Sequence, residues 1–256
     1  ALDFDFFEVL DSVTIARSRR HIEKYYNISD VGTFPERLKP ISVQPCLTSL
    51  DNAINYQQIY NVLDSLTLHI YTPTSFILSS RISKYIDPSQ HGKGLTQAGR
   101  EEGIRRLMSI NLLKRLESSV YAFRLTIDRI SKLIEDTMQS VRSYQNGSRV
   151  LELNDISDAT DWDDMDHVSW LHDLEKDAEN LELLSLMVQD ITPAYDAKLQ
   201  ELLRLIDEKQ RHPINPGNRK IIIFTAFSDT ADYLYQNISG YVKQKFGLNT
   251  AEITGS

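Results

Sequence analysis

The sequence predicts a mainly α-helical protein with a small, partial parallel α/β unit at its C-terminal end. Apolar residues of the central region recur at alternating steps of three and four, as they do in helices that pack along one another. The stretch KIIIFTAFSDTADYLYQNI, residues 220–238, instead opens with β-branched and apolar residues and changes to a helical pattern after Thr225. A turn-rich linker, His212–Asn218, separates the two parts.

Composition and charge limit the classes of protein to which the chain can belong. It has 256 residues, a net charge of −8, 41% hydrophobic residues and 25% charged residues, which is typical of a globular protein and unusual for a free-standing nucleic-acid binder. No apolar run reaches the length of about 20 residues that a bilayer-spanning helix needs, so we expect no membrane partner. Cys46 is the only cysteine, which excludes an internal disulfide framework and favours a cytoplasmic location.

Residues 1–48 are predicted to form a helix followed by an extended crossing. The helical pattern covers residues 4–26 and includes a basic stretch with Arg17, Arg19 and Arg20. These cations either stabilise the dipole of their own helix or contact a partner. The end of the region, LKPISVQPCLT, alternates weakly in polarity and contains two prolines, which indicates an edge strand or an extended segment.

Residues 49–212 are predicted to be helical, with a first helix at about 51–70 and one long helix at about 101–144. Asn146-Gly147 is typical of the C-cap of the long helix. Its apolar stripe extends over about three heptads and consists of Leu113, Leu116, Val120, Phe123, Ile127, Ile130 and Ile134. The expected packing partners are two downstream stripes: Leu171, Leu174, Ala178 and Leu181 in one, and Tyr195, Leu199, Leu202 and Ile206 in the other.

Charge is distributed unevenly along this helical region. Residues 152–179 contain eleven acidic residues and one basic residue, whereas residues 100–142 contain nine basic and six acidic residues. Such segregation indicates either separate charged surfaces or solvated helix faces. The segment Asp163–His167 has the composition of an acidic metal-binding box, but a polar run precedes it instead of a buried strand. We therefore expect an exposed acidic loop there and no metal site.

Residues 213–256 are predicted to form a strand–helix–strand unit. The strands are expected at Lys220–Thr225 and Thr250–Thr254, and the helix at about 229–245. Strands joined in this way run parallel in one sheet. A parallel sheet normally contains more than two strands and is covered on both faces. We therefore expect this chain to be a fragment of a longer protein that supplies the other strands.

One glycine-rich segment has the spacing of a phosphate-binding loop without its chemistry. In Gly94–Glu101, Arg100 replaces the lysine that binds phosphate, and Glu101 replaces the hydroxyl residue that holds magnesium. No apolar strand leads into the segment. The sequence thus contains no self-contained active site, and we expect no catalytic residue and no cofactor bound to this chain.

Several segments resemble a known family, and the first two named here decide the interpretation. Leu112–Ser119, LLKRLESS, followed by Tyr121–Phe123, is similar to a signature of bacterial Swi/Snf-type ATPases of helicase superfamily two. Residues 220–238 resemble motif IV of these proteins, which opens their second RecA-like lobe. Ile253–Ser256, ITGS, resembles the glycine-containing segment that follows in that lobe.

The N-terminal region resembles the same family more weakly. Val13–Tyr26, with its arginines, is similar to the stretch that closes the first RecA-like lobe, and Phe34–Arg37 is similar to the start of the connection. The resemblance then implies three parts: the end of lobe one at 1–48, a helical insertion at 49–212 and the start of lobe two at 213–256. It is specific in about a third of the chain.

The resemblance implies a DNA-stimulated ATPase that translocates along duplex DNA. ATP and Mg²⁺ would bind between the two lobes of the longer protein, outside this chain. The chain itself would contribute coupling between the lobes and grip on nucleic acid. The alternative is a helical protein-interaction module without catalytic activity, in which the acidic loop and the heptad face bind a partner protein.

The resemblance also implies a set of nucleic-acid-binding residues. Thr225 and Ser228 lie at the predicted start of a helix, where phosphate groups bind readily, although Ser228 is equally suited to be the N-cap of that helix. The charge of Asp229 would oppose a phosphate. The remaining candidates are Thr254, Gly255, Arg17, Arg19 and Arg20. The basic residues beside the heptad stripe either face DNA or are solvated, and their mixture with acidic residues favours solvation: Lys114, Arg115, Arg124 and Arg129.

Overall fold

A computed structural model describes residues 38–50, 54–85, 97–147 and 161–255. The chain has two compact units, residues 1–44 and 45–256. In the first unit, residues 38–44 have no regular secondary structure and are mostly exposed. Several predicted features lie outside the described residues: the helix at 4–26, Arg17, Arg19, Arg20, Phe34–Arg37, the first glycine of the loop-like segment at 94–101 and most of the acidic stretch before Asp161.

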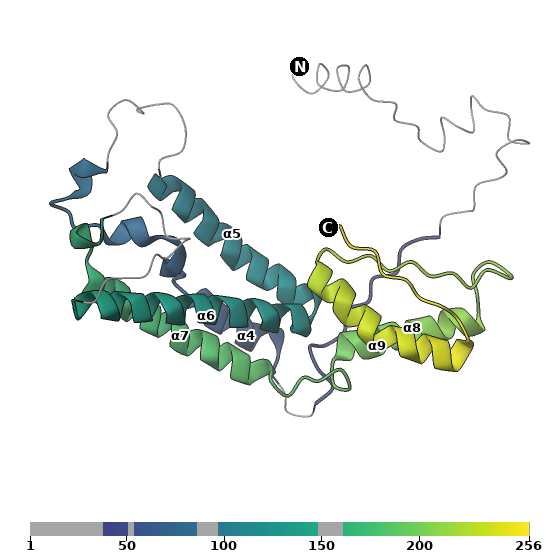
Figure 1. Cartoon of the computed structure of the whole chain (residues 1–256). Helices are drawn as coiled ribbons and strands as arrows, with labels where there is room; N and C mark the ends of the chain where they lie inside the picture. The colour runs from purple at the N-terminus through teal and green to yellow at the C-terminus, as the bar shows by residue number, and fades with distance from the viewer. Residues whose placement is uncertain (1–37, 51–53, 86–96, 148–160, 256) are drawn as a thin grey trace, which may run out of the picture. The chain divides into compact units, whose positions relative to one another are not determined.

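The second unit confirms the prediction of a mainly α-helical protein (Figure 1). Its α-helices are α4 (Tyr56–Asp64), α5 (Gln97–Ser118), α6 (Val120–Gln145), α7 (His167–Val188), α8 (Ala197–Arg211) and α9 (Ser228–Phe246). Short 3₁₀ helices occur at His69–Tyr71, Pro73–Phe76, Ile82–Lys84 and Trp162–Asp164. None of the described helices combines the length and the apolar character needed to cross a bilayer.

The long helix predicted at 101–144 is two helices, so that prediction was wrong. The backbone of Ser119 is extended, with φ −160° and ψ 148°, and its hydroxyl accepts a hydrogen bond from the N–H of Ala122 at 3.0 Å. Ser119 therefore ends α5 and caps α6, because a serine side chain can replace the missing intrahelical partner of a first-turn N–H. The apolar periodicity continues through the break, which the sequence pattern alone does not reveal.

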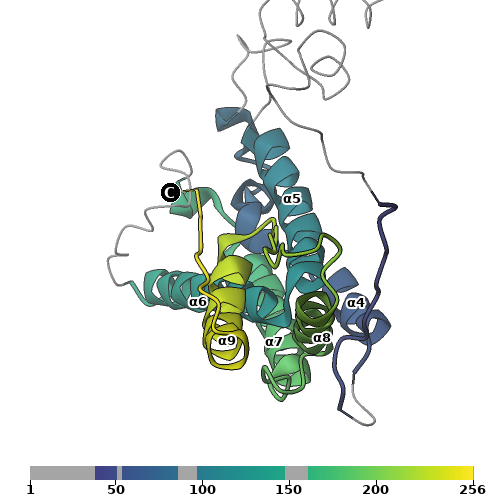
Figure 2. The same ribbon diagram turned by 90° about the vertical axis from the view of Figure 1, so that its right-hand side faces the viewer.

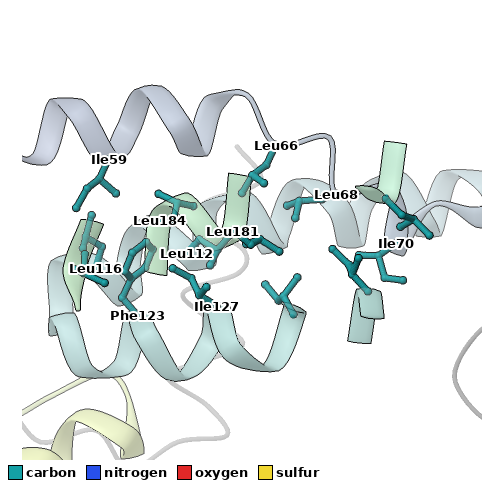
Figure 3. Close-up of a cluster of buried hydrophobic side chains, with 14 of the residues drawn as sticks. Ile59, Leu66, Leu68, Ile70, Leu112, Leu116, Phe123, Ile127, Leu181 and Leu184 are labelled. Atoms are coloured by element: carbon teal, nitrogen blue, oxygen red, sulfur yellow. The ribbon is translucent and has the colours of Figure 1, made fainter. Parts of the chain in front are cut away.

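The main apolar core lies between α4, α5, α6 and α7 (Figure 3). The predicted stripe is buried from Leu116 onward, and Phe123 and Ile134 are completely inaccessible to solvent. α7 faces this core with Trp170, Leu174, Leu181, Leu184 and Val188. Two of these, Leu174 and Leu181, belong to the predicted stripe of α7, whereas Leu171 and Ala178 are only partly buried at the edge of the core.

A buried carboxylate attaches the segment after α4 to α7. Asp177 is completely buried and accepts hydrogen bonds from the N–H and the hydroxyl of Thr67, both at 2.8 Å, and from the N–H of Leu68 at 2.6 Å. Leu68 has φ 52°, a left-handed backbone conformation that residues other than glycine rarely adopt. The three hydrogen bonds satisfy the buried charge and hold this strained turn in place.

The prediction of an exposed acidic loop at 163–167 was wrong for Asp164. This side chain is buried and accepts hydrogen bonds at 2.7 Å from both Lys84 and Tyr85. These donors lower the pKa of the Asp164 carboxyl below its usual value. A buried charge is tolerated when it is paired and hydrogen-bonded, so Asp164 connects two segments that are about eighty residues apart in sequence.

A second, smaller apolar cluster joins α8 and α9, the two helices that Figure 2 shows end-on. Its buried members are Leu199, Ile206, Tyr233, Ile238 and Val242. α9 occupies almost the range predicted from sequence, and Gly247, at φ 68°, ends it with an N–H bonded to the carbonyl of Lys243 at 3.0 Å. α8, which the sequence assigned to the helical insertion, thus shares its apolar face with the C-terminal helix.

The structure does not show the strands predicted at Lys220–Thr225 and Thr250–Thr254. Both segments lack regular secondary structure, and the described residues form only two isolated bridges, Thr48 with Asp196 and Ile77 with Met165. A strand needs a neighbour to accept and donate its backbone hydrogen bonds. The described residues offer neither segment such a neighbour.

Candidate functional site at the start of helix α9

The break between α5 and α6 contacts the first turn of α9. The hydroxyls of Ser118 and Ser119 lie 2.8 Å and 3.1 Å from the hydroxyl of Thr230, which is buried. Ser118 also lies 3.4 Å from the hydroxyl of Thr225, in the segment that leads into α9. The two segments that carry the family resemblance, more than a hundred residues apart in sequence, therefore meet through a chain of hydroxyl groups.

A partly buried ion pair completes this junction. Arg115 of α5 donates a hydrogen bond of 2.5 Å to Asp229, and their side chains are only 16% and 15% exposed. The guanidinium also lies over the ring of Phe227, 4.7 Å from its centre. Arg129 of α6 reaches the same carboxylate at 3.3 Å, but its side chain is 62% exposed.

The ion pair corrects one prediction. Arg115 is not a solvated basic side chain, because its guanidinium faces both a carboxylate and an aromatic ring. The hydrogen bond from Arg115, followed by the contribution of Arg129, lowers the pKa of the Asp229 carboxyl. Asp229 is therefore held in its charged form, and two cations offset that charge.

A tyrosine pair connects the junction to α8. The rings of Tyr121 and Tyr233 stack with centroids 5.0 Å apart and an angle of 10° between planes. The hydroxyl of Tyr233 donates to Asp196 at 3.0 Å, and Asp196 also caps α8 by accepting from the N–H groups of Lys198 and Leu199. Burial, and next the nearby charge of Asp196, raises the pKa of the Tyr233 hydroxyl. α6, α8 and α9 are thus connected at one point.

Four of the predicted nucleic-acid-binding residues line one open groove of about 730 Å³ beside the start of α9. They are Thr225, Ser228, Thr254 and Gly255. Ser228 is not the N-cap: the helix begins at Ser228 itself, Phe227 occupies the cap position, and no side chain caps the helix there. The Ser228 side chain is consequently not occupied in capping and is exposed to the groove.

Glu101, the last residue of the segment that resembles a phosphate-binding loop, has a structural role instead. Glu101 is buried in α5 and accepts hydrogen bonds from the N–H and the hydroxyl of Thr74, at 3.0 Å and 2.5 Å. Its carboxylate fastens the 3₁₀ helix Pro73–Phe76 to α5. Across the described ranges, His, Cys, Asp and Glu residues form no group of three or more that could hold a metal ion.

Comparisons with known proteins give no family for this chain. No protein-family model, no curated protein and no solved structure matches it significantly. Its functional interpretation consequently rests on the geometry of the junction and the groove, together with the resemblance carried by the two segments that meet there.

Proposed function

We propose that this chain is part of a DNA-stimulated ATPase of the Swi/Snf helicase-like type. One observation carries the proposal. The segment resembling the family signature, Leu112–Phe123, and the segment resembling motif IV contact each other through Arg115, Ser118 and their partners in α9. Two motifs that resembled the family by coincidence would have no reason to form one polar junction.

In this proposal the junction couples the helical insertion to the second RecA-like lobe. Because α9 is attached through Asp229, Thr230 and Tyr233, a rotation of α9 would pull directly on the end of α5 and the start of α6. Opening and closing of two lobes is a common way to convert a chemical cycle into movement. The contribution of this chain is inter-lobe coupling and grip on duplex DNA.

The groove beside α9 is the proposed contact with the DNA backbone. The first N–H groups of a helix have no intrahelical acceptor and attract phosphate. The main objection from sequence was the charge of Asp229, and Arg115 and Arg129 offset that charge. Thr225 and Ser228 on one side of the groove and Thr254 on the other then supply hydroxyl donors. Such contacts are independent of base sequence and weaken with salt.

The exposed apolar residues around the groove support a sheet that continues beyond the described residues. Ile223, Phe224 and Ile253 line the groove and are 41%, 90% and 94% exposed. Isolated surface hydrophobics are ordinary, but three beside one groove indicate a surface that another element covers. In the proposal, further strands of the RecA-like lobe pair with Lys220–Thr225 and Thr250–Thr254.

ATP and Mg²⁺ do not fit the described residues of this chain. The Glu101 carboxylate accepts a hydrogen bond from Thr74, and the described residues contain no cluster of metal-binding side chains. We therefore place nucleotide binding elsewhere in the longer protein and assign no chemical step to residues of this chain.

The proposal is tested by ATP hydrolysis of the full-length protein, with and without duplex DNA, at low and moderate salt. We expect strong stimulation by DNA that declines as salt rises. Ser228→Glu should weaken the stimulation without changing hydrolysis in the absence of DNA. Gln244→Glu, which adds the same charge at the other end of α9, should have little effect on either rate.

Two outcomes would contradict the proposal. If the folded full-length protein hydrolyses no ATP under any condition, the motor interpretation fails and the helical interaction module is favoured. If DNA stimulates hydrolysis but Ser228→Glu and Gln244→Glu behave alike, the ATPase interpretation stands and the groove is not the DNA contact.

A further inference from the structure

Helix α5 has an exposed apolar stripe opposite its buried face. Glu101, Leu112 and Leu116 are buried, whereas Ile104, Leu107 and Ile110 are 47%, 66% and 50% exposed. Residues three apart lie close together along one side of a helix, so these three side chains form a continuous ridge. No described residue of the chain covers this ridge.

Beside the ridge lies Gly103, a glycine that no contact within the described structure requires. Gly103 lies in the interior of α5, where glycine is less favourable than alanine by about 0.5–1 kcal/mol. A Cβ atom at this position would meet no other atom within 4 Å, so no contact in the described chain requires its absence. A glycine on a helical face allows another backbone to approach closely. The open space at Gly103 therefore leaves room for a close neighbour beside the ridge.

The charges around the ridge identify the chemistry of that neighbour. Arg100 and Lys114 are exposed and lie seven residues before and after Leu107, so they mark the two ends of the ridge on the same face. The described residues provide neither of them with an acidic partner. The ridge therefore has an aliphatic centre and a positive charge at each end.

We propose that this ridge, Arg100–Lys114 of α5, binds an amphipathic helix of another protein that has an aliphatic centre and acidic ends. Pairing with the same ridge of a second copy is disfavoured by charge. A parallel pair would place Arg100 against Arg100, and an antiparallel pair would place Arg100 against Lys114, and like charges at such positions are repulsive. The proposal does not depend on the ATPase interpretation, because α5 could serve as a docking site on either kind of protein.

The probe is a synthetic helical peptide of about three heptads with leucines at the a and d positions and glutamates in its first and last turns. Its binding to the full-length protein is measured by fluorescence anisotropy, next to a peptide in which lysines replace the glutamates. We expect saturable binding of the acidic peptide and binding weaker by about tenfold or more for the basic one.

Gly103→Leu is the decisive variant. It should reduce binding by about tenfold or more, because its side chain occupies the space of the approaching helix. Leucine is a better helix former than glycine, so the thermal midpoint should not fall and misfolding cannot explain the loss. Leu107→Lys should also reduce binding. Leu186→Lys is the matched control, because Leu186 is 52% exposed on α7 and lies outside the ridge.

Several results would overturn the proposal. Equal binding of the two peptides, no binding of either, or unchanged binding by Gly103→Leu would each exclude an acidic helix on this ridge. A lower thermal midpoint for Gly103→Leu would show that the chain itself covers the ridge. Self-association in sedimentation that Leu107→Lys abolishes would assign the ridge to a second copy instead.

Discussion

Large apolar side chains are buried in the helical bundle but exposed in the C-terminal segments. In the bundle, Phe123 and Trp170 are completely buried. Beside α9, Phe224 is 90% exposed and Ile253 is 94% exposed. Both regions are rich in large apolar residues, so composition does not explain the difference.

The difference follows from where each kind of element finds its hydrogen bonds. A helix satisfies its backbone internally and needs only a neighbouring face to cover its apolar stripe. A strand-like segment needs other strands before it can form, and only then does it present a face that helices can cover. The bundle therefore buries its apolar stripes within the described residues, whereas the proposed function makes the segments around α9 depend on strands of a longer protein.

The largest expected effect compares one phenylalanine from each region. Phe123→Ala should lower the free energy of unfolding by about 3–5 kcal/mol, because it removes a large buried side chain and leaves a cavity. Phe224→Ala should change it by no more than about 0.5 kcal/mol, because the side chain is already in solvent. Urea denaturation of the two variants measures the contrast. Comparable losses would show that Phe224 is packed in the folded chain.

The next effect concerns the junction that joins the two regions. Arg115→Met should cost about 2 kcal/mol, since it removes a charged hydrogen bond and leaves the Asp229 carboxylate partly desolvated. Arg129→Met should cost less than about 1 kcal/mol, because that pair is longer and exposed. A double-mutant cycle with Asp229→Asn should show coupling for Arg115 and little for Arg129. Equal coupling would mean that solvent screens both pairs alike.

A smaller effect is expected at the break between α5 and α6. Ser119→Ala should cost about 1 kcal/mol, because it removes the cap of α6 and one hydroxyl contact with Thr230. Ser140→Ala removes a serine whose hydroxyl donates to the carbonyl of Asp136 in its own helix, and its effect should stay within about 0.5 kcal/mol. Thermal unfolding of the two variants, compared with the native protein, tests whether Ser119 fixes the break.

The smallest effect expected is a change in pH dependence. Hydrogen bonds from Arg115 lower the folded pKa of Asp229, and those from Lys84 and Tyr85 lower that of Asp164. Carboxyls of this kind stabilise the fold fully above their unfolded pKa of about 4, and the stabilisation is lost as pH falls through the folded pKa.

Denaturation series at several acidic pH values measure this dependence. The free energy of unfolding should decline below about pH 4. Asp229→Asn should make this decline with pH less steep, and the part that remains should come from Asp164. Asp128→Asn, at an exposed position on α6, should leave the slope unchanged. An unchanged slope in Asp229→Asn would contradict the lowered pKa.

Sequence patterns predicted the helices better than their breaks and contacts. α9 and the buried stripe of α6 follow directly from apolar periodicity. The break at Ser119 was not predicted, because the apolar stripe continues across it. The burial of Asp164 was not predicted, because its neighbours in the sequence are acidic and its partners, Lys84 and Tyr85, are distant in the chain.

The candidate site was predicted only in part. Thr225, Ser228, Thr254 and Gly255 were each predicted to contact nucleic acid, without a prediction of how the first two lie relative to the last two, and all four line one groove. The pairing of Arg115 with Asp229 could not be predicted, because it joins residues 114 positions apart and each alone resembles a solvated charge. The expected strands were inferred from local preference, but a strand forms only with partners that local preference does not supply.

Hydrogen exchange at residues 220–225 and 250–254 tests the contrast between the two regions most directly. The measurement compares the 256-residue chain with the longer protein that the resemblance implies. We expect these amides to exchange without protection in the shorter chain, while amides of α6 and α7 are protected in both proteins. In the longer protein the two segments should become protected as strands of a sheet. Protection already present in the shorter chain, or absent from both proteins, would contradict the account.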